Sequence, residues 1–230
     1  MASTSANVAA AIEFWYSPGS CSVAGHVLLH ESNLRFVSHT VPRGYEPNSL
    51  PASYTSVNPR KLIPALSVDG EIITELPAIL VTVAYLSHHP EWVEGSSSAG
   101  LIAGRAKVYE WLGFLSSHVH ATAFAAFFRP YRFTDREDVR PVVKQKGRQT
   151  IFDALADIEA RLPAQPGFVV AGAFSVVDPF VYLIARWAEL VETGALHRFP
   201  RLQVFARMME QREATTKALE SEGIPPLFQQ

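Results

Sequence analysis

A single cysteine lies where a strand-like segment gives way to a helix-like one. In FWYSPGSCSVAGHVLLHE (residues 14–31), the apolar run 12–16 ends at a Ser-Pro-Gly-Ser turn, Cys21 follows, and helical periodicity begins at once. A helix N-terminus presents unpaired N–H groups and a positive dipole end, which lower the pKa of a thiol. The same amides could instead hold the thiolate of a bound ligand. A cysteine outside any disulfide is also often a small buried hydrophobe, and composition alone leaves that reading open.

Hydroxyl groups stand on both sides of this cysteine in the sequence. Tyr16 and Ser17 stand at the expected strand end, and Ser22 follows the cysteine directly. A hydroxyl at a strand end is more often a solvated turn group than a catalytic one, so each is a weak signal alone and a stronger one in a cluster. We take Tyr16, Ser17, Cys21 and Ser22 as the candidate catalytic residues.

Two further segments offer ligand-binding groups. Pro64 interrupts an apparent strand, where it cannot donate to a ladder; an edge strand explains this, and so does a cis Ile63–Pro64 bond that turns the Ile63 backbone toward a peptide-like ligand. Glu75 precedes Leu76 and Pro77, which open a helix. A carboxylate there usually complements the helix dipole, but it could also bind a ligand ammonium while the helix amides bind a carboxylate. That pairing suits an α-amino acid.

An aromatic run follows farther along the chain. ATAFAAFFRPYRF (121–133) is typical of core or of a helix packing surface, and it could also line a pocket for a flat apolar substrate. The candidate pocket wall consists of apolar residues with helical spacing: Trp111, Leu115, Phe124, Phe127 and Phe128. His118 and His120 are two residues apart and point away from each other on a helix, so we expect no metal site.

A small α/β unit must position the first groups. We predict that residues 1–11 form a flexible arm and that six segments follow: strand 12–16, helix 22–33, strand 35–41, irregular connection 42–61, hairpin 63–75 turning at Asp69-Gly70, and helix 77–87. Beyond a polar linker at 88–99, the periodicity is helical over 100–128, 137–162, 175–192, 199–210 and 212–221. Ser175 and Asp178 have the spacing of a capping box. The predicted fold is α/β plus all-α, with domains at 12–87 and 100–222.

Composition narrows the class of protein. The 230 residues are 48% hydrophobic, which supports a packed core, and the net charge of -2 without a basic block argues against nucleic acid. One cysteine cannot form an intrachain disulfide, so a reducing, cytoplasmic location is expected. The start of the sequence does not read as a secretory signal, and no run of about 18 apolar residues predicts a membrane span.

Together these segments resemble the cytosolic glutathione transferases over residues 12–222. The resemblance is carried by FWYSPGSCSVAGHVLLHES, VNPRKLIPALSVDGEIITELPAI, YEWLGFLSSHVHATAFAAFFRP and FSVVDPFVYLIARWA, of which the first and third are similar to the bacterial beta class in particular. It implies a thioredoxin-like N-terminal domain, a helical C-terminal domain, glutathione as co-substrate and a homodimer.

The resemblance also implies roles for individual residues. It implies a cis bond at Ile63–Pro64, with the Ile63 backbone pairing with the cysteinyl unit of glutathione. It places the γ-glutamyl end at Glu75 and the amide that follows it. The beta-class positions fall on Tyr16, Cys21, Ser22 and His120, while other classes make Ser17 a secondary candidate for activating the sulfur.

Three positions depart from the family pattern. NPRKLIP (58–64) has Lys61 where glycine is usual and Leu62 where a polar side chain often reaches glutathione. Leu76 stands where many members have serine. Side-chain contacts to the tripeptide are therefore expected to be fewer, with Arg60 or Lys61 holding the glycyl carboxylate.

These observations leave several functions open. The first is attack of glutathione thiolate on a hydrophobic electrophile held between the domains. The second is glutathione-dependent cis–trans isomerisation, as in fungal natural-product enzymes of the pseurotin-pathway type. The third is a non-catalytic, transferase-like binding protein, and the fourth is a mixed disulfide between Cys21 and glutathione.

Overall fold

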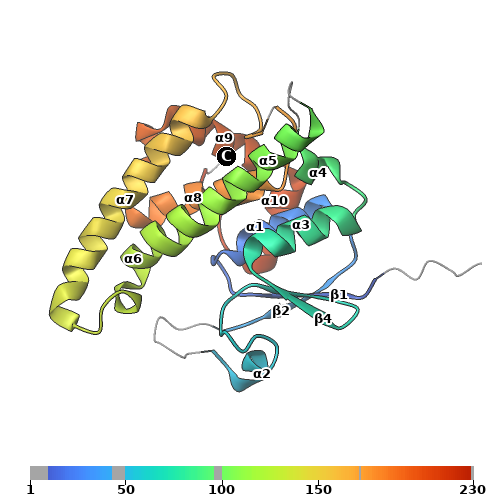
Figure 1. Ribbon diagram of the computed structural model, residues 1–230, viewed down its shortest axis with the longest axis horizontal. Helices are drawn as coiled ribbons and strands as arrows, with labels where there is room; N and C mark the ends of the chain where they lie inside the picture. Colours follow the sequence, from blue (N-terminus) through green and yellow to red (C-terminus); the bar gives the residue numbers. More distant parts are fainter. Residues whose placement is uncertain (1–9, 43–49, 96–99, 171, 229–230) are drawn as a thin grey trace, which may run out of the picture.

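The computed structural model describes residues 10–42, 50–95, 100–170 and 172–228. All but the last two residues of the predicted arm 1–11 lie outside the described residues. In Figure 1 a twisted sheet with its covering helices forms one part of the molecule, and a larger set of helices forms the other. This is the thioredoxin-like domain plus helical domain that the sequence predicts.

A four-stranded sheet forms the first part. The strands are β1 (Ile12–Tyr16), β2 (Val37–Thr40), β3 (Ala65–Val68) and β4 (Glu71–Thr74), in the order β2-β1-β3-β4. β1 pairs with β2 in parallel and with β3 antiparallel, and β3 pairs antiparallel with β4. The hairpin turns at Asp69 and Gly70, both with positive φ, as the Asp-Gly signal predicts.

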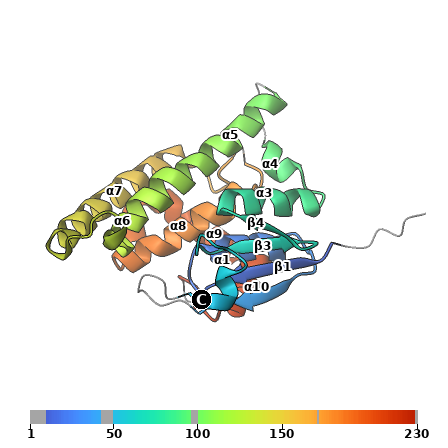
Figure 2. The same cartoon turned by 60° about the horizontal axis from the view of Figure 1, so that its bottom comes forward.

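Helices α1 (Ser22–Glu31) and α3 (Leu76–Leu86) lie side by side on one face of this sheet (Figures 1 and 2), while the one-turn α2 (Ala52–Thr55) lies in the connection before β3. Close packing of α1 on β1 depends on Gly25. A Cβ at that position would lie 2.8 Å from the Phe14 ring.

The second part is helical, as predicted. It contains α4 (Glu91–Glu94), α5 (Leu101–Gly113), α6 (Ala125–Phe128), α7 (Arg140–Arg161), α8 (Val177–Val191), α9 (Pro200–Glu210) and α10 (Glu213–Glu222). Between α5 and α6 the chain continues as a π-helix, Phe114–Phe124, which the sequence periodicity did not predict. Short 3-10 turns occur at Pro130–Arg132, Glu137–Val139 and Ala195–Arg198.

The segment predicted as a linker, 88–99, is structured where it is described. It contains α4, whose Trp92 is buried and stacks on His89 with ring centroids 4.2 Å apart. The Trp92 carbonyl accepts the Val176 N–H at 3.0 Å, so this segment packs beside the start of α8. Residues 96–99 lie outside the described part of the chain.

The start of α8 has the capping box that its spacing predicts. Asp178 Oδ2 accepts the Ser175 N–H at 2.7 Å and lies 2.9 Å from the Ser175 hydroxyl, which in turn accepts the Val177 N–H at 3.3 Å. Asp178 Oδ1 accepts the Val169 N–H at 2.8 Å, which fixes the preceding loop. Burial raises the pKa of the Asp178 carboxyl to about 6, although the hydrogen bonds from these donors act to lower it.

The last helix returns to the first. α10 packs along α1, and Arg212 before α10 donates from Nε to Glu31 at the end of α1 at 3.0 Å. No helix of the described part is both long and apolar enough to cross a membrane.

Candidate functional site

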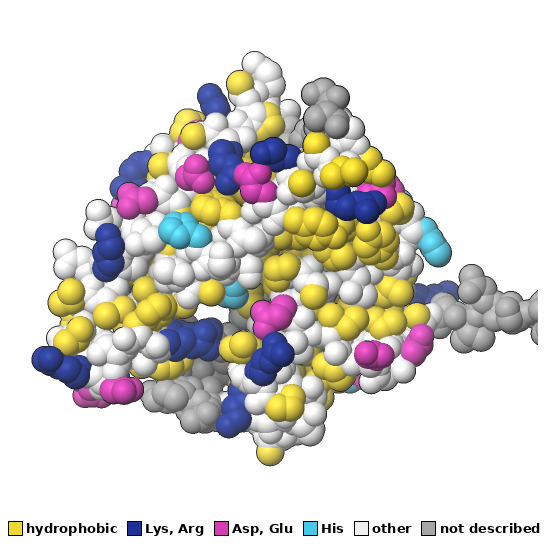
Figure 3. Space-filling view, viewed as in Figure 1, with side chains coloured by type: hydrophobic (Ala, Val, Ile, Leu, Met, Phe, Trp, Pro, Cys, Tyr) yellow, Lys and Arg dark blue, Asp and Glu magenta, His cyan; other side chains and the backbone are white. Residues whose placement is uncertain are grey.

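A cavity of about 340 Å³ lies between the sheet part and the helical part. Figure 3 shows the surface hollowed there, with basic side chains at the border of the hollow. The sheet part contributes Ser17, Pro18, Gly19, Ser20, Cys21, Asn58, Leu62, Ile63, Pro64, Glu75 and Leu76 to the lining. The helical part contributes Ser116, His120, Ala121, Phe124, Ala125, Phe128, Arg129, Arg132, Trp187 and Leu190.

The cavity brings together most, but not all, of the residues predicted for the site. Its lining includes nine of them: Ser17, Cys21, Ile63, Pro64, Glu75, Leu76, His120, Phe124 and Phe128. Six predicted residues lie elsewhere: Tyr16, Ser22, Lys61, Trp111, Leu115 and Phe127. The two groups differ because a residue next to the cavity in sequence can still have its side chain on the opposite side of the backbone.

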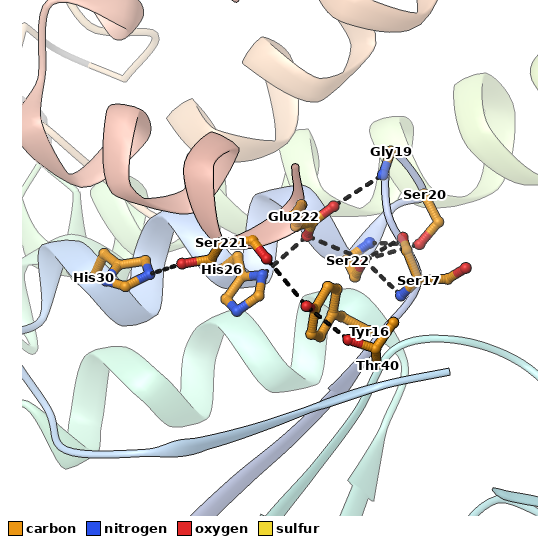
Figure 4. A network of polar contacts seen from close by, with 10 residues as sticks. All are labelled: Tyr16, Ser17, Gly19, Ser20, Ser22, His26, His30, Thr40, Ser221 and Glu222. Carbon is orange, nitrogen blue, oxygen red and sulfur yellow. Dashed lines mark hydrogen bonds and ion pairs between the residues drawn. The ribbon is translucent and has the colours of Figure 1, made fainter. Parts of the chain in front are cut away.

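Tyr16 points away from the cavity. Tyr16 is a buried residue of β1, and the centroid of its ring lies 4.6 Å from that of His26 on α1. Its hydroxyl donates to the carbonyl of Ser221 at 3.1 Å and accepts from Thr40 at 2.8 Å (Figure 4). The prediction that this hydroxyl lies at the cavity is therefore wrong.

Ser22 is also buried behind the cavity wall. Its hydroxyl lies 3.1 Å from the Ser17 carbonyl and 2.9 Å from the Ser20 hydroxyl, and it accepts the Ser17 N–H at 3.3 Å. Ser22 therefore shapes the turn from inside and does not reach a ligand in the cavity.

Ser17 is the hydroxyl that faces the cavity. Figure 4 shows its side chain pointing away from the network around Ser22. No hydrogen bond among the described residues uses this hydroxyl, although the Ser17 backbone is held on both its N–H and its carbonyl. A fixed backbone with an available hydroxyl is suited to donating a hydrogen bond to a ligand atom.

The Cys21 thiol contacts the other ligand-binding segment. Its sulfur lies 3.0 Å from the carbonyl oxygen of Ile63 and donates to it. The Ile63–Pro64 bond is cis, as the resemblance implies. The carbonyl of Ile63 thus accepts one hydrogen bond from the thiol, and its second acceptor position and the Ile63 N–H form no further hydrogen bond among the described residues.

Asn58 organises the loop before this cis bond. Its Nδ2 donates to the Leu62 carbonyl at 2.7 Å, the same carbonyl that accepts the Tyr54 hydroxyl at 2.5 Å. Its Oδ1 accepts the Arg60 N–H at 3.1 Å. Lys61 has φ of 57°, the left-handed conformation that favours glycine, which accounts for glycine being the usual residue at this position of the family pattern. No pattern in the sequence indicated the role of Asn58 beyond its place in the turn.

Glu75 lies at the junction of β4 and α3 with an unusual backbone. Its φ and ψ are 71° and 119°, a conformation that non-glycine residues rarely adopt and that is found mainly at functional sites. Arg60 donates to its carboxylate at 3.2 Å in an exposed pair. The amide of Leu76 is in the first turn of α3, where N–H groups have no partner within the helix.

Aromatic side chains form the opposite wall. Trp187 of α8 lies 5.2 Å from His120, 5.4 Å from Phe124 and 6.0 Å from Phe128, measured between ring centroids. Its Nε1 donates to the Gly19 carbonyl at 3.0 Å, which ties the helical wall to the turn before Cys21. Sequence reasoning missed Trp187 because most residues of α8 are buried, so no pattern marks one of them as cavity-facing.

The other aromatic candidates serve packing. Trp111 is buried under the guanidinium of Arg161, 3.8 Å from the ring centroid, and Leu115 is fully buried in the core. Phe127 of α6 lies beneath the ammonium of Lys144 on α7, 4.7 Å from the ring centroid. Their prediction as pocket residues is wrong: Trp111 of α5, Leu115 of the π-helix and Phe127 of α6 contact packing partners and do not line the cavity.

A buried carboxylate from the far end of the chain holds the turn in place. Oε2 of Glu222 accepts the Gly19 N–H at 2.9 Å, and Oε1 lies 2.9 Å from His26 Nδ1 and 3.4 Å from the Ser22 hydroxyl (Figure 4). Glu222 and His26 are both fully buried at their side chains. Beside them, burial and the neighbouring His26 and Lys217 lower the pKa of His30 to about 4. No local pattern in the sequence indicated this network.

Comparison with known proteins agrees with this geometry. Residues 19–84 match the family model described as glutathione S-transferase, N-terminal domain. The chain is 27% identical over 217 residues to glutathione S-transferase GstA of Escherichia coli O157:H7, covering 93% of this chain and 100% of that protein.

Solved structures give the same result. A beta-class glutathione S-transferase of Sphingomonas chungbukensis is 26% identical, with a TM-score of 0.76 over 93% of this chain and 100% of that one. The bacterial transferase BphK, solved as a ternary complex, is 29% identical, with a TM-score of 0.76 over 92% of this chain and 100% of that one. Residues 19–84 thus match the N-terminal domain of the glutathione S-transferases, and over nearly its whole length the chain is similar to bacterial members of that family, including the beta class.

Proposed function

We propose that this protein activates the thiol of glutathione for attack on an electrophilic carbon of a hydrophobic small molecule. The observation that carries the proposal is the juxtaposition of three ligand-binding groups in one cavity: the cis Ile63–Pro64 segment, the Glu75 carboxylate at the start of α3, and the turn at Ser17. Solved relatives described as bound to glutathione, such as a sphingomonad transferase 28% identical to this chain, support the choice of ligand.

In this proposal the tripeptide lies along the sheet part of the cavity. The γ-glutamyl ammonium pairs with Glu75, and its carboxylate accepts from the amide of Leu76 at the helix start. The cysteinyl carbonyl accepts the Ile63 N–H. The sulfur then lies beside Ser17 and Cys21.

Ser17 is the proposed activating hydroxyl. A donated hydrogen bond stabilises thiolate relative to thiol, and a lowering of the pKa by two units corresponds to about 2.7 kcal/mol. The thiolate attacks an electrophile held against Phe124, Phe128 and Trp187, forming a carbon–sulfur bond. The Cys21 thiol donates a hydrogen bond to the Ile63 carbonyl and so supports the cis segment. We therefore assign Cys21 a positioning role and not the role of nucleophile.

Calorimetric titration with millimolar glutathione tests the binding step directly. We expect saturable heat with one site per chain. A titration without heat, repeated at a second temperature, would contradict the proposal, since the enthalpy of binding is not zero at both.

The Ser17→Ala variant tests the activating group. We expect the pKa of bound glutathione, read from the ultraviolet absorbance of its thiolate against pH, to rise by at least about one unit, and kcat/KM to fall about 10- to 100-fold. Ser116→Ala, which removes a hydroxyl on the helical wall, is the matched control. If Cys21→Ala raises the thiol pKa and Ser17→Ala does not, the two assignments must be exchanged.

The same addition supports two outcomes. The adduct is the product of conjugation, or it expels the thiolate after bond rotation and completes a cis–trans isomerisation. The alternative to conjugation is an isomerase of the fungal pseurotin-pathway type. Measuring whether glutathione is consumed during turnover of an activated alkene distinguishes conjugation from isomerisation.

A non-catalytic binding role is favoured instead if no Ser17, Cys21 or Tyr16 variant changes any activity. Intact-mass measurement tests for a mixed disulfide between Cys21 and glutathione.

We also propose that the protein is a cytoplasmic homodimer. In Figure 3 hydrophobic side chains gather over the region of α3, away from the cavity. Exposed apolar residues occur on neighbouring elements, including Ile72 on β4, Tyr85 on α3 and Ile102 on α5. Light scattering after gel filtration is expected to give twice the 25.4 kDa chain mass, and a single-chain mass at every concentration would contradict this.

A further inference from the structure

Two arginines face the part of the cavity that the proposed glutathione site leaves to the electrophile. Arg129 is half-buried and Arg132 is exposed, and both line the cavity together with Phe124 and Phe128. Sequence reasoning treated this segment as an aromatic surface and assigned these cations no role. A cavity predicted to hold an apolar molecule thus carries two positive charges at one end.

The two arginines stand directly after α6. Helix α6 ends at Phe128, and Arg129 leaves it with φ of -139° and ψ of 58°. A 3-10 turn over Pro130–Arg132 follows, closed by the hydrogen bond from the Arg132 N–H to the Arg129 carbonyl at 3.0 Å. Arg129 stands just before this turn and Arg132 ends it, and both arginines line the cavity.

Of the three carboxylates at positions 135–138, two pair with other arginines, and Asp135 forms no ion pair among the described residues. Glu137 pairs with Arg140 at 3.1 Å, and Asp138 pairs with Arg136 at 2.5 Å. Among the described residues no ion pair joins either cavity arginine to a carboxylate, and the one carboxylate of the lining, Glu75, pairs with Arg60.

We propose that Arg129 and Arg132 bind a carboxylate group of the electrophile. The substrate class is then an aryl or alkenyl carboxylic acid, with its apolar body against Phe124, Phe128 and Trp187 and its reactive carbon toward Ser17. Guanidinium groups suit this ligand because their planar N–H donors match carboxylate oxygens in a bidentate manner. This inference rests on the proposed glutathione-dependent function.

For an activated alkene the step balances without a further reactant. Glutathione gives up its thiol proton to solvent, and the thiolate adds to the β-carbon, forming the carbon–sulfur bond while the π electrons move to the α-carbon and its activating carbonyl. The resulting enolate takes a proton from water. The two arginines stay outside this electron flow and hold the distant carboxylate.

A matched pair of electrophiles tests the inference. Ethacrynic acid and its methyl ester have the same reactive alkene and differ in the charge of one carboxyl group. We expect the ratio of kcat/KM for acid over ester to fall about tenfold in Arg129→Gln/Arg132→Gln, with the larger part from half-buried Arg129→Gln. The control is Arg136→Gln, which removes an exposed arginine of the same segment that pairs with Asp138.

The two arginines could also bind a carboxylate of glutathione itself, the one on its glycyl residue. If the KM for glutathione rises about tenfold in the double variant and the acid-to-ester ratio stays constant, the arginines hold the tripeptide and the inference is wrong. An unchanged ratio with unchanged KM also overturns it.

A binding measurement separates this inference from the proposed function. The saturated analogue of ethacrynic acid cannot react, so calorimetry can compare its binding with that of its ester whether or not the protein turns over an electrophile. Tighter binding of the acid that is lost in the double variant but kept in Arg136→Gln supports the inference even if conjugation fails. Equal binding of acid and ester by the unmodified protein overturns it even if conjugation succeeds.

Discussion

Replacing Glu222 by alanine is expected to lower the free energy of unfolding by about 3 kcal/mol and to weaken glutathione binding at the same time. The carboxylate is buried and accepts from Gly19 N–H and from the ring of His26. Its removal leaves buried polar groups without partners, each at a cost of about 1–3 kcal/mol. Chemical denaturation at fixed pH measures the loss.

The effect on binding follows from what Glu222 holds. Gly19 lies between Ser17 and Cys21 in the proposed sulfur site, and its carbonyl is fixed by Trp187 on the opposite wall. Loss of the carboxylate releases the N–H side of this residue, so we expect the KM for glutathione to rise several-fold at a temperature where the variant is folded.

Two variants make the Glu222 test specific. Glu222→Gln keeps the shape and one acceptor oxygen, so it should recover part of both losses. Glu220→Ala removes an exposed carboxylate two residues earlier on α10 and should change neither. If Glu222→Ala loses stability while the thiolate pKa and the KM for glutathione stay constant, the residue supports only the fold.

The second large effect is expected at the start of α8. Asp178→Ala leaves three buried donors unpaired, on the Val169 amide and on the amide and hydroxyl of Ser175. We expect a loss of about 3–4 kcal/mol, or a fall of roughly 10 °C in Tm for a chain of this size. Calorimetry should show a smaller loss of unfolding free energy for Ser175→Ala and almost none for Asp153→Ala, which changes an exposed residue of α7. If Asp178→Ala loses no more stability than Asp153→Ala, the role assigned to Asp178 is wrong.

The Asp178 effect has a predictable dependence on pH. Burial raises the pKa of this carboxyl from 3.8 in the unfolded chain to about 6 in the folded protein. Between these values the folded state binds more protons, so the contribution of Asp178 to the free energy of unfolding falls as pH rises from about 4 to about 6. The difference between the unmodified protein and Asp178→Ala should therefore be larger at pH 5 than at pH 7.5. An equal difference at the two values would show that the carboxyl is ionised throughout.

Short-range signals predicted much of the fold. The Asp69-Gly70 turn, the strand at 12–16 and the Ser175–Asp178 cap each depend on residues within a few positions of one another, and each is present in the structure. The observed ends of helices and strands differ from the predicted ones where packing between distant parts of the chain decides them. The π-helix at 114–124 left no mark on the apolar periodicity.

The site was predicted in part for the same reason. Ser17, Ile63 and Glu75 lie in turns whose local chemistry suggests a ligand, and all three line the cavity. Tyr16 and Ser22 share those turns but point the other way, because strand and helix geometry alternates the direction of neighbouring side chains. Contacts across 168 and 203 residues, from Trp187 and Glu222 to Gly19, leave no pattern in one sequence.

The return of α10 to α1 has a consequence for the order in which the working protein forms. The thioredoxin-like segment emerges first during synthesis, and its sheet needs no residue beyond β4. The turn at Gly19 is different, since its carbonyl waits for Trp187 and its amide for Glu222. A nascent chain that has folded its sheet therefore still lacks two of the contacts that hold the proposed thiol-binding turn, and these form only after α8 and α10 have left the ribosome.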